Sequence, residues 1–155
     1  MNWKQYISHL NSNDKIEQYS FNSPAPHFLL QELKIHFELN ELPNELEQLY
    51  NQTDGVNEIL NGEKIGELIW TADKVIRINN EYRNDQNFRK LYMSFDQLLF
   101  IADAENGDLF GFVTLDGGFH RNDIFVWNHE DDSRNWVAPS LAKFIEWWTN
   151  GTIKV

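Results

Sequence analysis

Three short apolar segments in the second half of the chain restrict its possible folds more than any other feature. The segments are Gln97–Ala102, Asp108–Leu115 and Asp123–Trp127, and glycine-containing links at residues 103–107 and 116–122 separate them. Links of this length are too short for the crossover that joins parallel strands, so the segments are expected to pair as antiparallel hairpins. The sequence therefore predicts a strand meander.

Helical patterns lie on both sides of this meander. Apolar residues spaced three and four apart, with proline, capping and glycine signals at the ends, mark these segments. The predicted helices are Trp3–Leu10, Pro26–Glu38, a helix from Pro43 to the Asp54-Gly55 turn, a helix from the cap Thr71 to about Tyr82, and a helix from Pro139-Ser140 to Gly151. A short strand at Gly66–Trp70 is predicted directly before the fourth helix. Helices before and after a strand meander are typical of an α+β fold.

Length and composition suit one domain and exclude several kinds of site. The chain has 155 residues, of which 41% are apolar, so we expect a single domain over residues 1–155. It has 13 Lys and Arg against 24 Asp and Glu, and the resulting net charge of −11 disfavours direct binding to nucleic acid. Because the chain has no cysteine, disulfides and thiolate sites are excluded.

No part of the sequence is expected to enter a membrane. The longest clean apolar run, Leu98–Ala102, is far shorter than the roughly 20 residues that cross a bilayer. The first residues also lack the apolar block of a signal peptide. These features predict a soluble, cytoplasmic protein.

The common motifs of catalysis and metal binding are missing. The five histidines form no HExxH motif, and Asp103–Asp108 lacks the glycine position of an EF-hand loop. The adjacent residues His129–Asp132 cannot all face one ion. Gly62 and Gly66 have the spacing of a P-loop, but Glu67 replaces its lysine, and no Gly-x-Ser-x-Gly elbow occurs. We expect no metal, no cofactor and no enzymatic activity, although a carboxylate pair for glycoside hydrolysis stays open.

Negative charge concentrates on the meander and its loops. Residues 94–135 contain nine Asp and Glu against two Lys and Arg, a net charge of −7. Such a region is either a solvated surface or a binding face, and charge alone does not decide between them.

Three segments in fixed order resemble a known family. The segments are Leu42-Pro43 with Leu46, Leu49, Tyr50 and Asp54-Gly55; Leu98–Ala102 with Asn106–Phe112; and Ile124–Glu130 with Val137-Ala138 and Ser140–Ile145. Together they resemble the SUKH superfamily, also called the Smi/Knr cell-wall-assembly-regulator family. The resemblance covers about residues 26–149 and leaves residues 1–25 as an N-terminal helix and connector.

The resemblance implies both a fold and a function. It implies a curved antiparallel sheet of about four or more strands flanked by helices. Most bacterial members resemble immunity proteins, which bind and neutralise a cognate polymorphic toxin, often a nuclease. The 18 asparagines suggest AT-rich coding, and hence a low-GC Gram-positive host with LXG-type toxins.

The implied partner is a basic toxin domain, because a nuclease cleft must hold phosphate. An acidic face would be steered into such a cleft and would block it. The candidate contacts are Asp103, Glu105, Asp108, Asp116, Asp123, Glu130, Asp131 and Asp132, with Trp127 and Trp136 as aromatic anchors. Asp108 could instead fix the hairpin turn.

Two other functions stay open at the level of sequence. Fungal relatives of the family suggest a regulatory scaffold of cell-wall or envelope synthesis, with several weak partners. The aromatic residues of the C-terminal part could also form a groove for a small molecule or a reaction. The sequence is compatible with a monomer or a weak dimer.

Overall fold

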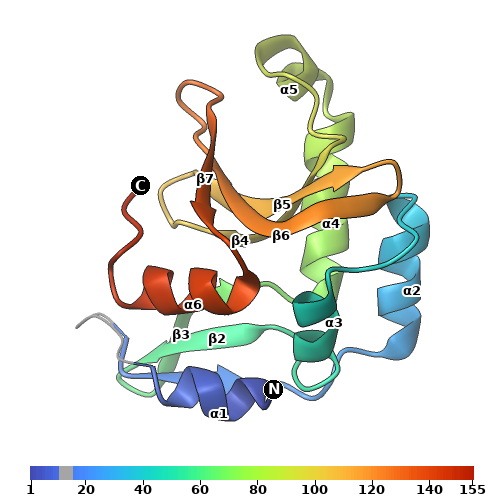
Figure 1. Cartoon of the computed structure of the whole chain (residues 1–155). Helices are drawn as coiled ribbons and strands as arrows, with labels where there is room; N and C mark the ends of the chain where they lie inside the picture. The colour runs from blue at the N-terminus through green and yellow to red at the C-terminus, as the bar shows by residue number, and fades with distance from the viewer. Residues whose placement is uncertain (11–15) are drawn as a thin grey trace.

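Two antiparallel sheets form the frame of the protein in a computed structural model, which describes residues 1–10 and 16–155 and only the backbone at His120 (Figure 1). The strand orders are β1-β2-β3 and β4-β5-β6-β7. The strands are β1 (Gln18–Phe21), β2 (Val56–Leu60), β3 (Glu63–Ile69), β4 (Leu98–Asp103), β5 (Leu109–Leu115), β6 (Gly118–Trp127) and β7 (Arg134–Ala138). The second sheet contains the predicted meander, so the predicted α+β class is confirmed.

Helices cover both faces of the second sheet. The helices within the described ranges are α1 (Trp3–Ser8), α2 (His27–His36), α3 (Asn44–Tyr50), α4 (Ala72–Asn84), α5 (Gln86–Leu91) and α6 (Leu141–Thr149). On one face, the ring of Phe110 packs against Phe144 of α6, with 4.8 Å between centroids. On the other face, Phe100 packs against Tyr82 of α4 at 5.8 Å. Figure 1 shows α6 and α4 on opposite sides of this sheet.

Strand β4 joins the two sheets. The register of β4 with β5 is irregular between Phe100 and Ala102, so Ile101 has no partner residue in it. The carbonyl of Ile101 instead accepts a hydrogen bond of 2.9 Å from the N–H of Trp70, which directly follows β3. Opposite this irregularity, a Cβ at Gly111 would overlap the Leu99 carbonyl, so the close approach of β5 requires glycine there.

One buried amide fixes α4 on β4. The Asn79 side chain is 1% exposed; its Nδ2 donates to the Phe100 carbonyl and its Oδ1 accepts from the Phe100 N–H, both at 2.8 Å. Nδ2 also donates to the Val75 carbonyl. Asn79 thus satisfies both backbone groups of a buried residue, as a neighbouring strand would.

Most predicted elements are present with shifted bounds, and one predicted link is wrong. The link at residues 116–122 is reduced to a turn at Asp116 and Gly117, which have φ of 49° and 81°, because β6 already begins at Gly118. The sequence patterns did not predict β1, β2, α5 and β7. These elements have four to six residues each, too few for a clear apolar period.

The Asn79 contacts predict a large loss of stability on Asn79→Ala. The substitution leaves a buried N–H and a buried carbonyl of Phe100 unpaired, which costs about 2–4 kcal/mol in the free energy of unfolding. Urea denaturation would measure it. The matched control is Asn87→Ala on the exposed side of α5, which should stay within about 0.5 kcal/mol of the wild type. Equal losses in both variants would contradict the role of the Asn79 amide.

Candidate functional site

The fold brings two turns that contain candidate carboxylates together at one end of the second sheet. The β4–β5 turn and the β6–β7 turn meet through Asp108, which is 3% exposed. Its Oδ1 accepts a 3.1 Å hydrogen bond from the backbone N–H of His129, and the ring Nδ1 of His129 lies 2.6 Å from the same oxygen. Asp108 therefore connects the two turns, and its side chain is not presented to a partner.

A second, partly buried carboxylate holds the β6–β7 turn against the rest of the fold. Asp132 accepts hydrogen bonds from the Trp127 indole at 2.7 Å, the Met93 N–H at 2.9 Å and the Arg134 guanidinium at 3.1 Å. Burial raises the pKa of the Asp132 carboxyl, but these three hydrogen bonds outweigh burial and lower its pKa overall.

Two further candidates also have structural roles. Trp127 is 2% exposed, and its ring lies 5.1 Å from the centroids of both Tyr92 and Phe95. Asp103 accepts a 3.0 Å hydrogen bond from the Trp70 indole and another from the N–H of Glu105. These contacts occupy both groups within the fold.

Three of the candidate carboxylates reach solvent from the joined turns. Glu105, Glu130 and Asp131 are exposed. Hydrogen bonds from the Ser133 side chain and N–H lower the pKa of the Asp131 carboxyl, which keeps it ionised. We call the surface that Glu105, Glu130 and Asp131 form on these two turns the acidic turns. They carry the negative charge that a partner at this end would meet.

Exposed apolar side chains border the acidic turns. Leu91 is 71% exposed and Met93 is 64% exposed, at and after the end of α5. The backbone of Met93 is tied to this end of the sheet, because its N–H donates to Asp132 and its carbonyl accepts from Arg134 at 2.9 Å. Sequence reasoning missed these two residues, and their only signal was an apolar pair outside any periodic pattern.

The three remaining candidates lie elsewhere. Asp116 is in the β5–β6 turn, at the opposite end of the second sheet near α2 (Figure 1). Asp123 is half-buried within β6. Trp136 is 50% exposed on the edge strand β7, and its ring makes an edge contact with Trp147 at 6.4 Å. The structure therefore does not gather the ten candidates into one surface.

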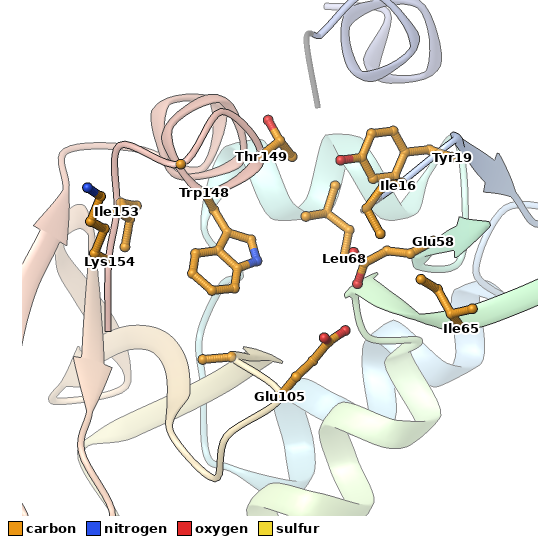
Figure 2. A pocket seen from close by; sticks show the side chains of 12 residues that line it. Ile16, Tyr19, Glu58, Ile65, Leu68, Glu105, Trp148, Thr149, Ile153 and Lys154 are labelled. Carbon is orange, nitrogen blue, oxygen red and sulfur yellow. The ribbon is translucent and has the colours of Figure 1, made fainter. Parts of the chain in front are cut away.

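A cleft opens on the other side of the β4–β5 turn, between the first sheet and the C-terminal residues (Figure 2). Its volume is about 370 Å³. Its lining is mainly apolar and aromatic, with Glu58 from β2, Glu105 from the β4–β5 turn and Lys154 near the C-terminus as the charged groups. The lining residues are Ile16, Tyr19, Glu58, Ile65, Leu68, Ala104, Glu105, Trp148, Thr149, Gly151, Ile153 and Lys154.

Glu58 and Glu105 converge in this cleft. Figure 2 shows their carboxyl groups pointing toward the same space as the Trp148 indole. Glu58 is only 9% exposed. Burial, the charge and hydrogen bond of Glu105, and the charge of Asp103 together raise the pKa of the Glu58 carboxyl to about 7. Sequence reasoning missed Glu58, because the pairing depends on two residues 47 positions apart.

The family comparison agrees with this architecture. A family model described as the SMI1 / KNR4 family (SUKH-1) matches residues 31–147, which is more than half of the chain. The chain belongs to the SUKH-1 family. This membership confirms the resemblance carried by the three sequence segments, and it is consistent with an immunity-protein role without identifying a toxin. No curated protein matches the chain.

The described part of this SUKH-1 chain contains no group of three or more His, Asp or Glu side chains arranged to hold a metal ion. The helices in the same residues are all too short or too polar to cross a bilayer. The acidic turns and the cleft present carboxylates, aromatic rings and apolar side chains, with Lys154 as a further charged group in the cleft.

The raised pKa of Glu58 predicts a pH-dependent loss of stability. The ordinary pKa of a glutamate carboxyl is 4.5, and that of Glu58 in the folded chain is about 7. Between these two pH values, the unfolded chain releases the Glu58 proton while the folded chain retains it. The free energy of unfolding therefore falls as the pH rises, and the loss is complete above pH 7. Glu58→Gln removes this ionisation. Relative to the wild type, its free energy of unfolding should increase by about 2 kcal/mol between pH 5 and pH 8.

Urea denaturation at both pH values measures this difference. Glu63→Gln, at an exposed position of the neighbouring strand β3, is the matched control and should keep a constant difference from the wild type. A pH-independent difference for Glu58→Gln would show that the Glu58 carboxyl is ionised in the folded state across this range.

Proposed function

We propose that this protein is an immunity protein that binds and neutralises a cognate bacterial polymorphic toxin in the cytoplasm of the producing cell, without catalysis. The observation that carries the proposal is membership in the SUKH-1 family. The toxin is proposed to be a basic nuclease domain of an LXG-type protein. A net charge of −11 suits a basic partner.

The acidic turns and the exposed side chains of Leu91 and Met93 are the proposed contact surface. A well-packed apolar centre with a charged rim is the usual arrangement of a protein interface. Glu105, Glu130 and Asp131 supply the negative charge, while Asp103, Asp108, Trp127 and Asp132 hold these groups in place. The charged side chains would speed the encounter with a basic cleft, and occupation of that cleft would exclude substrate.

Affinity capture of the tagged protein from its host, followed by mass spectrometry, tests the function. We expect one stoichiometric partner with a basic C-terminal domain, and we expect co-expression of the protein to relieve that domain's toxicity. Recovery of several substoichiometric enzymes of envelope synthesis would instead support a regulatory scaffold. A captured partner that remains toxic during co-expression would contradict neutralisation.

Charge reversal at the acidic turns tests the proposed surface. Glu130→Lys with Asp131→Lys should slow association with the partner about tenfold or more at low salt and weaken the salt dependence of the rate. Stopped-flow or surface-plasmon measurements at two salt concentrations would show this effect. Glu32→Lys with Glu81→Lys, at exposed positions on α2 and α4, changes the net charge equally and is the control. Equal effects of the two pairs would show that total charge, and not the acidic turns, steers association.

A further inference from the structure

The cleft contains two acidic groups, Glu58 and Glu105, that have no cationic partner among the described residues. The ion pairs among the described residues are Lys74–Glu67, His129–Asp108, Arg134–Asp132 and Lys143–Glu146, so neither Glu58 nor Glu105 takes part in one. Glu58 is 9% exposed, and its carboxyl is hydrogen-bonded to the Glu105 carboxyl in a cleft whose lining is mainly apolar and aromatic. This arrangement is unfavourable for the folded protein on its own.

The backbone keeps the space for this pair open. A Cβ at Gly66 would lie 2.7 Å from one carboxyl oxygen of Glu105 and 3.2 Å from one of Glu58, so a side chain there would require the Glu105 carboxyl to shift. Glu105 itself has a φ of 65°, in the left-handed region that L-residues seldom adopt. Glycine on β3 and this turn conformation together allow the two carboxyl groups to meet in the cleft.

The groups around Glu58 and Glu105 indicate which chemical class of ligand would bind there. A planar guanidinium can donate to two carboxylates at once, and it stacks favourably on an aromatic face. Trp148 and Tyr19 provide aromatic rings in the same cleft, and Leu68 and Ile153 cover the apolar stem of a long side chain. A metal ion fits less well, because no group of three potential ligands occurs in the described part of the chain.

We propose that this cleft binds an arginine side chain of the protein partner, with the guanidinium held between Glu58 and Glu105. This inference rests on the proposed function for the identity of the partner, but the cleft can be tested without that partner. The volume of about 370 Å³ is at the low end for ligand pockets, which span about 300–1,000 Å³, and it suits one inserted side chain. Glu105 also belongs to the acidic turns, so the arginine would enter at the edge of the proposed contact surface.

The first experiment uses a small arginine probe. Nα-acetyl-arginine methylamide is titrated into the ¹⁵N-labelled full chain at pH 8, and resonances of the Trp148 indole and the Gly66 amide are followed. We expect saturable shifts, no saturable shift with the neutral citrulline analogue, and at least tenfold weaker binding for Glu58→Gln with Glu105→Gln. Glu63→Gln with Glu81→Gln changes the charge equally at exposed positions and should bind the probe like the wild type.

Lys154 provides a second variant that leaves the carboxyl pair intact. Because Lys154 lines the cleft, Lys154→Met removes a competing positive charge and should strengthen binding of the probe severalfold. The proposal is overturned if the probe causes no saturable shift, if citrulline binds equally well, or if the Glu58 and Glu105 variant binds like the wild type.

The captured partner separates failure of this inference from failure of the proposed function. If Glu58→Gln with Glu105→Gln loses the probe but keeps full affinity for a neutralised toxin, the immunity function stands and the inserted arginine is overturned. If the probe binds as expected and the captured partner is not a toxin, the arginine site stands and the proposed function fails. A loss of affinity of tenfold or more for both probe and toxin supports the two together.

Discussion

The backbone hydrogen bonds of one fully buried strand hold this structure together. Leu98–Ala102 of β4 is covered on both faces, so each of its N–H and carbonyl groups needs a partner inside the protein. β5 supplies some of these partners, Asn79 of α4 serves both groups of Phe100, and the N–H of Trp70 serves the carbonyl of Ile101. The second sheet, its supporting helix and the first sheet are therefore fixed by the requirements of a single strand.

The acidic turns lie at the end of this strand, where hydrogen bonds to carboxylates hold them in place. Asp103 is the last residue of β4 and accepts a hydrogen bond from the Trp70 indole. Asp108 directly precedes β5 and accepts a hydrogen bond from the N–H of His129. Asp132 then anchors the second turn to Trp127 and Met93. The partly or fully buried carboxylates thus act as structural acceptors. Glu105, Glu130 and Asp131 reach solvent, which gives a rigidly held negative surface beside exposed apolar side chains.

The carboxylates that the fold buries wholly or partly differ in how their charge is compensated. Asp108 accepts a hydrogen bond from the His129 N–H, and Asp132 accepts one from the Met93 N–H and pairs with Arg134. Glu58 is also buried, yet it faces Glu105, and its pKa rises to about 7. Folding alone gives no reason to place two carboxyl groups together in a cleft, whereas a cationic ligand does. Glu105 connects this cleft to the acidic turns, so both features serve one proposed interface.

The sequence by itself determined the α+β class, the meander and most helices, because apolar periodicity and turn residues are local signals, and three of its segments resembled the SUKH superfamily. It also located the excess of negative charge at residues 94–135. Only the tertiary structure decided which charges are available. Asp108 and Trp127 are buried by contacts with residues distant in sequence, and Glu58 meets Glu105 across two different sheets. Burial and side-chain pairing arise from long-range packing, which no local pattern in the chain encodes.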